Sequence, residues 1–166
     1  MAHPEHHTRG VHPHMNNEED DGQLKDLLEE TRILLPGAEL LAAFLTTLPF
    51  QERFSQLQTA ERVVFVIAFL LDLVAITCFL TPAAYHRVAQ PIRNKNRFKQ
   101  FANKFILAGL VPFTVAMALV TFLVAAVVVS QPFGIVAGSV ILLLELVMWW
   151  LVPYMRAHDK SSSTNA

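Results

Sequence analysis

The sequence predicts an all-α, polytopic membrane protein with four transmembrane helices and a short amphipathic amino-terminal helix. Composition is the first indication, because 53% of the 166 residues are hydrophobic and only 16% are charged, against about 25% in an average soluble domain. The second is a set of four long apolar runs, expected to span the membrane at 33–50, 63–81, 105–130 and 133–152. A helix of about 20 apolar residues crosses the ~30 Å hydrocarbon core of a bilayer. One membrane domain is therefore expected over 23–155.

The two ends of the chain are polar and are expected to be disordered. Residues 1–22 are rich in histidine and end in an acidic run, and 156–166 is rich in Ser and Thr, so neither can bury enough apolar surface to fold alone. The spacing of His3, His6 and His7 is compatible with a transition metal. The sequence nevertheless favours a solvated tail, with no metal site and no cofactor.

An amphipathic segment, 23–32, precedes the first span and places leucines on one face. This pattern predicts an interfacial helix that leads directly into the membrane. Pro36 removes a backbone donor near the start of the first span and is expected to bend the entry. By the same argument, Pro82 is expected to mark the end of the second span.

The third span is expected to be interrupted at Gly109 and Pro112. Only two residues separate it from the fourth span, which predicts a tight antiparallel helical hairpin. On the fourth span, Gly134 and Gly138 form a small-xxx-small pair of the kind that lets helix backbones approach closely. These glycines offer a helix-packing face, so the sequence is compatible with a homo-oligomer.

Orientation follows from the distribution of Lys and Arg. With a cytoplasmic amino terminus, ten basic residues close to the spans face inward and two face outward, which is a strong positive-inside signal. We therefore expect a plasma (inner) membrane protein with both termini in the cytoplasm. The basic loop 83–104 is then a candidate contact for anionic lipid, and its charge needs no nucleic acid to explain it. The inward residues are Lys25, Arg32, Arg87, Arg93, Lys95, Arg97, Lys99, Lys104, Arg156 and Lys160, and the outward ones are Arg53 and Arg62.

Three acids lie within the spans, Glu39 in the first, Asp72 in the second and Glu145 in the fourth. Counting residues at 1.5 Å each puts Asp72 and Glu145 roughly 10 to 14 Å inside the cytoplasmic boundary and Glu39 about 9 Å inside it. Small residues one turn away put Asp72 and Glu39 on the less bulky side of their helices, and at about 100° per residue Glu145 falls within about 20° of the directions of Gly134 and Gly138. We therefore expect all three to share one layer and to point at protein.

Three interpretations of these acids stay open. They can take up and release a proton or a cation, which is the usual expectation for a carboxyl group within a membrane. They can be protonated or paired and fix helix packing, for example Glu39 with Arg32 across two helical turns. They can also extend toward the headgroups, which is easiest for Glu39 and hardest for Asp72.

Further pairing or gating candidates are Arg32, His86 and Arg87, which lie near the ends of the first two spans. His86 is a candidate for pH sensing because histidine titrates close to neutral pH, although an ordinary interfacial histidine explains it as well. No phosphate-binding glycine loop, nucleophile elbow or His-rich metal helix occurs in the sequence. The sequence therefore does not predict an enzyme.

Three segments carry a resemblance to a known family: Leu35–Phe50 (LPGAELLAAFLTTLPF), Arg53-Phe54 and Pro82–Arg87 (PAAYHR). Through them, and over roughly 23–155, the chain resembles a family of small actinobacterial four-span membrane proteins of unknown function. Members of that family are often labelled sodium/proton antiporters. The resemblance implies a four-span fold and a transport activity, and it brings no established catalytic residues.

The expected function is proton- or sodium-coupled transport in which Asp72 and Glu145 titrate or bind the ion. The alternative is a non-transporting structural or accessory membrane subunit. A transporter is expected to bring two or more acids to a polar cavity that is open on one side. A scaffold is expected to hold them in a dry interface, capped by arginine or by backbone groups.

Overall fold

The computed structural model describes residues 29, 33–88, 95–152 and 155. Within these ranges the chain forms helices joined by short turns, and no strand occurs. Four helices are long and apolar enough to cross a membrane, namely Ile33–Phe50, Thr59–Tyr85, Arg97–Val128 and Gln131–Leu151. The all-α, four-span fold expected from the sequence is confirmed. The terminal tails, and all of the amphipathic segment 23–32 except residue 29, lie outside the described residues.

The first span consists of an α-helix over 33–47 that tightens into the 3-10 turn η1, Leu48–Phe50. Pro49 lies in the first turn of η1, where its missing N–H is tolerated. Gln51 is extended and breaks the helix, and a second 3-10 turn, η2, covers Glu52–Gln56. The connection to the next span is therefore short and partly helical.

The second helix, α2, runs over Thr59–Val88 and contains Pro82 in its interior. The expectation that Pro82 ends this helix is wrong. A proline deprives the helix of one i→i−4 hydrogen bond, but packing against neighbouring helices allows spans to continue through it. The Pro82 ring is among the most completely buried side chains of the described residues, which is consistent with this explanation.

The third helix, α3, runs without a break over Lys95–Val128, with Pro112 inside it. The expected interruption at Gly109 and Pro112 does not occur. Gly109 has a different role, because a Cβ atom at this position would lie 2.8 Å from Cβ of Cys78 and 2.8 Å from the Phe79 ring. The glycine allows α3 to approach α2 more closely than any other residue would.

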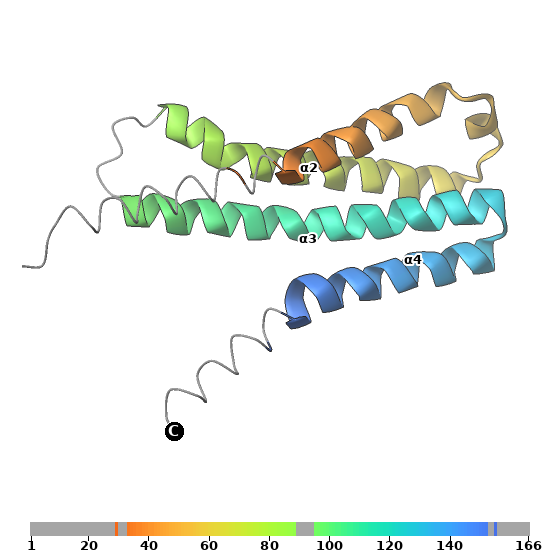
Figure 1. The fold of residues 1–166 in the computed structure, drawn as a ribbon. Coiled ribbons are helices and arrows are strands. Elements are labelled where there is room, and N and C mark those ends of the chain that lie inside the picture. Colours follow the sequence, from red (N-terminus) through yellow and green to blue (C-terminus); the bar gives the residue numbers. More distant parts are fainter. Residues whose placement is uncertain (1–28, 30–32, 89–94, 153–154, 156–166) are drawn as a thin grey trace, which may run out of the picture.

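Both helices are longer than a bilayer requires. The 30 residues of α2 and the 34 of α3 correspond to about 45 and 51 Å of helix, against ~30 Å of hydrocarbon. Most of the segment expected as a basic loop, 83–104, is therefore helix, and only 89–94 lies outside the described residues. In Figure 1 the green ends of α2 and α3 extend past the drawn helices of the first span and α4.

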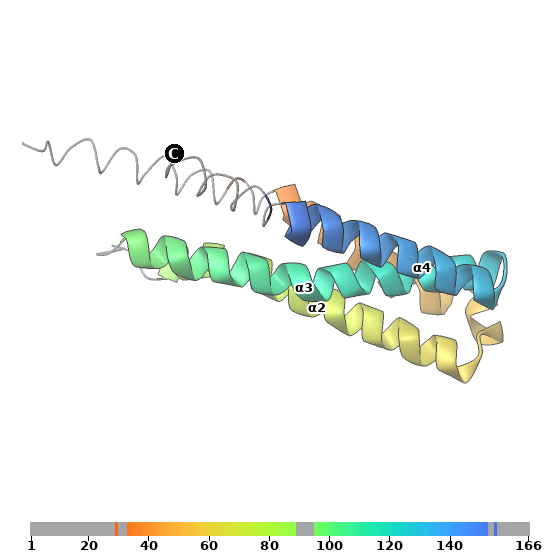
Figure 2. The ribbon, with the colours of Figure 1, turned by 90° about the horizontal axis from the view of Figure 1, so that it is seen from below.

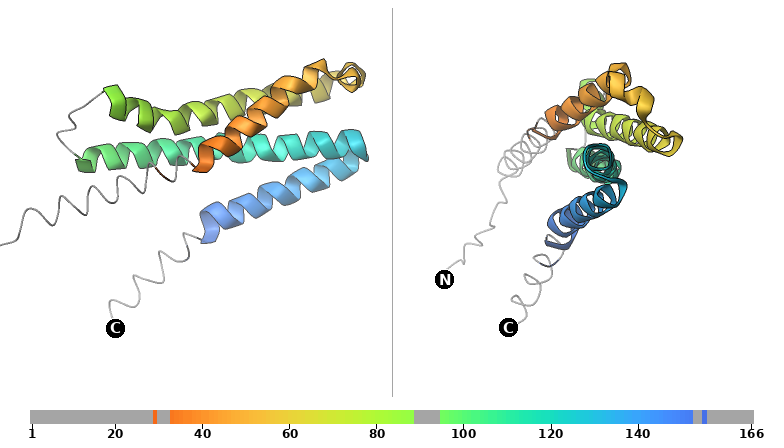
Figure 3. Two further views of the ribbon diagram at one scale, coloured as in Figure 1. Left: turned by 45° about the horizontal axis from the view of Figure 1, so that its top comes forward. Right: turned by 90° about the vertical axis from the view of Figure 1, so that its right-hand side faces the viewer.

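The fourth helix, α4, covers Gln131–Leu146 and continues into a π-helical turn, η3, over Val147–Leu151. Figure 1 shows α3 between α2 on one side and α4 on the other. The view from below in Figure 2 shows α4 running along α3, and the end-on view in Figure 3 shows the first helix beside α2. The bundle is thus arranged around α3.

Two apolar clusters tie the first helix to this arrangement. One contains Ala38, Ala75, Phe79 and Phe113 and lies toward the basic end of the bundle. The other contains Leu45, Phe65 and Leu123 and lies toward the η1–η2 end. The rest of the helical surface carries many exposed large apolar side chains, as expected for helices that contact lipid.

Candidate functional site

Asp72 lies at the middle of the buried stripe of α2. The stripe alternates steps of three and four residues, which keeps it on one face of the helix. It consists of Phe65, Ala68, Asp72, Ala75, Phe79 and Pro82, all buried. The Asp72 side chain is 0% exposed, and neither of its carboxyl oxygens has a hydrogen-bond partner among the described residues.

The register between α2 and α3 shows what faces Asp72. Gly109 of α3 meets Phe79 of α2, and Phe65 packs in one cluster with Leu123 at the other end of the contact. For two antiparallel helices, these pairs place Asp72 opposite Ala116, which is also fully buried. The carboxyl group is therefore held in a seam of small apolar side chains.

Glu145 lies on the face of α4 that packs against α3. It is 7% exposed, and its Oε2 atom is buried without a hydrogen-bond partner in the described part of the chain. Gly134 and Gly138 lie on the same face. A Cβ atom on Gly134 would lie 2.7 Å from Cβ of Ala126, and one on Gly138 would lie 2.9 Å from O of Ala118.

The glycine face of α4 is thus occupied by α3 of the same chain. This corrects the expectation that Gly134 and Gly138 offer a packing face to a second copy. The same register brings Glu145, seven residues beyond Gly138, to the level of Thr114 on α3. Thr114 is 3% exposed, and its hydroxyl donates a hydrogen bond to O of Leu110 at 2.8 Å.

Asp72 and Glu145 point at opposite sides of α3. The side that faces α2 includes Gly109 and the side that faces α4 includes Ala118, and at about 100° per residue these positions lie on opposite faces. Among the described residues, α2 and α4 each pack on α3 and not on one another. The two carboxyl groups therefore share a level, within about 5 Å along the axis, but not a cavity.

Glu39 behaves differently from the other two acids. Its side chain is exposed on the outer face of the first helix, whereas the adjacent Ala38 is fully buried. The expectation that all three acids point at protein is therefore wrong for Glu39 within the single chain. Its candidate partner Arg32 lies outside the described residues.

The π turn η3 follows Glu145 directly and positions Trp149. The Trp149 indole stacks on Phe113, with ring centroids 6.3 Å apart and planes 6° apart, and it packs against the cluster that contains Ala38. Nothing in the sequence indicates a π turn or this contact. π turns are frequent at functional sites, and this one brings the end of α4 into contact with Phe113 of α3.

At the basic end of the bundle, aromatic rings connect α2 and α3. Tyr85 lies 5.7 Å from Phe98 and 4.9 Å from Phe101, measured between ring centroids. Arg87 is exposed at the end of α2. His86 belongs to α2, but its side chain lies outside the described part of the structure. The resemblance motif PAAYHR is thus a helical segment at this end.

The described residues contain no group of three or more His, Cys, Asp or Glu side chains that could hold a metal ion. The hydroxyl of Thr77 donates to O of Leu73 and the hydroxyl of Thr81 donates to O of Thr77, at 2.8 and 2.7 Å. These threonines bond to their own helix, as is common within spans. Among the described residues, Asp72 therefore has no ring of oxygen ligands of the kind that a cation requires.

Comparison with known proteins identifies one family. The family described as "Family of unknown function (DUF6328)" matches residues 14–153, which is most of the chain. No curated protein matches, and no solved structure matches. The family description states no activity and no organism, so the antiporter label stays an expectation.

Proposed function

Because the chain belongs to the DUF6328 family, which has no assigned activity, we propose its function from the site: proton-coupled transport across the membrane, with Asp72 as the proton-carrying group. The observation that carries the proposal is the complete burial of Asp72 without a hydrogen-bond partner in the described residues. A carboxyl group that only stabilised packing would be expected to have one. Leaving a buried polar group unsatisfied costs about 1–3 kcal/mol, and more for a charged group.

The surroundings of Asp72 favour a proton over sodium. Binding a proton removes the charge and with it most of the cost of burial. A sodium ion would need several further oxygen ligands, whereas the neighbouring positions are Ala68, Ala75 and Ala116. These small side chains make a seam that can open with little rearrangement of bulky groups. In the proposed cycle, α2 and α3 separate at Asp72 and admit water from one side.

Glu145 is the second proton-binding group of the proposal. It is nearly buried and has an unpartnered oxygen in the described part of the chain. Because α3 separates the two acids, they lie in different helix–helix contacts: Asp72 lies between α2 and α3, and Glu145 lies between α3 and α4. A displacement of α3 would therefore alter both carboxyl environments at once.

The non-transporting alternative is an accessory membrane subunit, and one observation favours it. The acids do not converge on a polar cavity, because Asp72 and Glu145 face opposite sides of α3. Neither of them lines the apolar-walled pocket at the η1–η2 end of the bundle. In this alternative the acids determine how α2 and α4 pack on α3, and the protein acts on a partner or on the bilayer. Neither proposal involves catalysis.

Proton movement in liposomes tests the proposal. Purified protein is reconstituted with a pH-sensitive dye inside, and proton, sodium and potassium gradients are imposed in turn. The wild type is expected to move protons under at least one gradient. Asp72→Asn is expected to abolish the movement, and Glu145→Gln to reduce it about tenfold or more, as is common when a proton-transferring group is lost.

The matched control is Glu61→Gln, which removes an acid outside the seam. Its Oε2 accepts a hydrogen bond from N of Gln58 at 2.9 Å, and glutamine retains an acceptor there. This variant is expected to transport like the wild type. No proton movement by the wild type under any gradient would reject transport in favour of the accessory role. Proton movement by Asp72→Asn equal to that of a transporting wild type would reject Asp72 as the proton-carrying group.

The location and contacts belong to the same proposal. We propose a plasma membrane protein with both termini in the cytoplasm, supported by the excess of Lys and Arg at that end. Exposed Arg87 and Lys104 support contact with anionic headgroups there. An acid that faces lipid is costly, so exposed Glu39 supports a homo-oligomer in which a second copy covers the first helix.

A further inference from the structure

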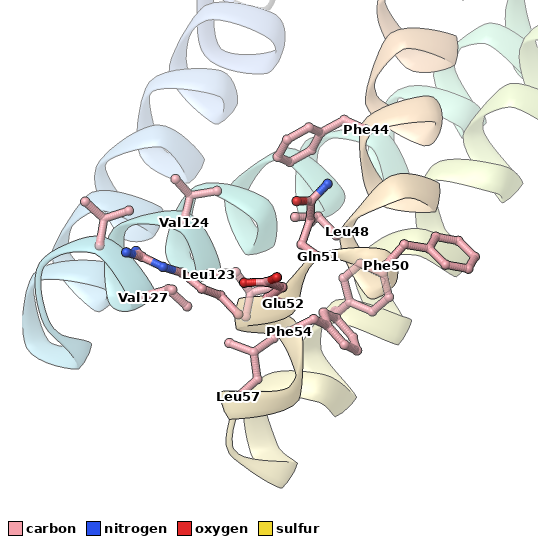
Figure 4. Close-up of a pocket in the computed structure, with 13 residues that line it drawn as sticks. Phe44, Leu48, Phe50, Gln51, Glu52, Phe54, Leu57, Leu123, Val124 and Val127 are labelled. Carbon is pink, nitrogen blue, oxygen red and sulfur yellow. The ribbon is translucent and has the colours of Figure 1, made fainter.

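A pocket of about 620 Å³ opens at the end of the bundle where the first span leaves the membrane. It lies between the first helix, the η1–η2 connection, the start of α2 and the last turns of α3, as Figure 4 shows. The volume is within the ~300–1,000 Å³ that is usual for ligand sites. The pocket contains none of the three acids discussed above, so it is a separate site.

The lining of the pocket changes character along its length. Phe44 on the first helix and Val124 and Val127 on α3 form apolar walls, and they come from helices that cross the hydrocarbon core. Gln51, Glu52 and Arg53 form the polar edge at the point where the chain turns. A ligand that matches this lining has an apolar chain and a polar head, like the lipids of a membrane.

The two charged side chains at the polar edge are available to a ligand. Glu52 and Arg53 are both exposed, and neither side chain has a hydrogen bond or ion pair with any described residue. Other charged side chains of the same connection are engaged. Nη2 of Arg62 donates to O of Ser55 at 2.7 Å, and Glu61 accepts the hydrogen bond from Gln58. The pocket thus offers one charge of each sign beside its apolar walls.

We propose that this pocket binds a phospholipid whose headgroup carries both a phosphate and a primary ammonium group. Arg53 would donate two hydrogen bonds to the phosphate, a geometry to which the planar guanidinium is suited. Glu52 would accept hydrogen bonds from the ammonium. An anionic headgroup without an amine leaves Glu52 without a partner, and a choline headgroup has no N–H to donate.

Retention of defined lipids by the full-length protein tests this proposal. The protein is equilibrated with an equal mixture of phosphatidylethanolamine, phosphatidylcholine and phosphatidylglycerol, and bound lipid is identified by native mass spectrometry. The wild type is expected to retain phosphatidylethanolamine preferentially. Glu52→Gln and Arg53→Gln are each expected to lower that retention roughly tenfold, the loss expected when a charge-assisted hydrogen bond is removed. Val124→Trp, which fills the apolar part, is expected to abolish it.

Two matched variants serve as controls. Glu61→Gln and Arg87→Gln each remove a charge that does not line the pocket, and both are expected to retain the lipid like the wild type. If Val124→Trp fails to fold by circular dichroism, the two exposed-residue variants still decide the question.

Four results would overturn the proposal. These are equal retention of the three lipids by the wild type, unchanged retention by Glu52→Gln and Arg53→Gln, a preference for phosphatidylglycerol that depends on Arg53 alone, or a second protein copy in place of lipid. The experiment does not involve Asp72, so a failure here leaves proton transport standing, and a failure of transport leaves lipid binding standing.

Discussion

Asp72 owes its environment to the residues three and four positions away. Ala68 and Ala75 share its stripe and are fully buried, so the backbones of α2 and α3 come close and exclude other groups from the carboxyl. Serine or threonine at these positions would have offered it a hydrogen bond. The alanines next to Asp72 therefore increase the free-energy cost of burying its carboxyl group. Such an unfavourable arrangement is typical of groups that are kept for function.

At this scale we predict that Asp72→Ala stabilises the protein. It removes a buried carboxyl that has no partner among the described residues, at the cost of a small loss of packing. The expected gain is about 1 kcal/mol in the free energy of unfolding, measured as a higher thermal midpoint in detergent. Asp72→Asn keeps a buried polar group of the same size and should show no such gain. A midpoint lowered by Asp72→Ala would instead assign the carboxyl a role in packing.

At the scale of elements, α3 organises the bundle by presenting a different surface to each neighbour. Toward α2 it offers Gly109, against which Phe79 packs, and toward α4 it offers backbone and side-chain atoms of Ala118 and Phe122. In the α2–α3 contact the glycine lies on α3, and in the α3–α4 contact the glycines lie on α4. In both contacts the neighbouring helix leaves no room for a side chain at the glycine. The π turn after Glu145 then brings Trp149 onto Phe113.

We predict that Gly134→Ala and Gly138→Ala each destabilise the protein by about 1–3 kcal/mol, the usual cost of overpacking. The new methyl group would lie 2.7 Å from O of Phe122 in the first case and 2.9 Å from O of Ala118 in the second, and backbone atoms cannot move aside cheaply. Thermal unfolding of each purified variant measures the effect.

Gly37→Ala is the matched control, because a Cβ atom there meets nothing within 4 Å. It should be neutral or stabilising by up to about 1 kcal/mol, the helix-propensity gain over glycine. Equal destabilisation by all three substitutions would mean that close packing of α4 on α3 is not the cause.

At the scale of the whole molecule, the bundle has two chemically different ends. One end holds the aromatic contacts of Tyr85 and the exposed cations of α2 and α3. The other holds the η1–η2 connection and the pocket with Glu52 and Arg53. Four spans bring both ends of the membrane domain to the same side, and the proposed orientation, with this side in the cytoplasm, rests on the excess of basic residues at the first end.

We predict that residues at the two ends label from opposite sides of the membrane. In a Cys78→Ala background, Gln56→Cys in η2 should react with a membrane-impermeant maleimide on intact cells. Gln100→Cys in α3 should react only after the membrane is permeabilised. Both positions are exposed. The reverse pattern would invert the orientation, and labelling of both in intact cells would contradict a membrane span between them.

The sequence by itself determined that this is a four-span helical protein and where its intramembrane acids lie along the chain. Transfer of a 20-residue apolar segment into lipid depends on that segment alone, so composition and length suffice. The rule that a proline ends a helix failed at Pro82, through which α2 continues. Packing against neighbouring helices compensates there for the lost backbone hydrogen bond. The small residues around Asp72 already predicted that it points at protein, which its burial confirms. Only the tertiary structure decided which helix covers which face: Glu39 is exposed, Asp72 faces α3, and the glycines of α4 are used within the chain. The physical reason is that burial belongs to a contact between two helices, and the periodicity of one helix does not reveal which surface its partner will present.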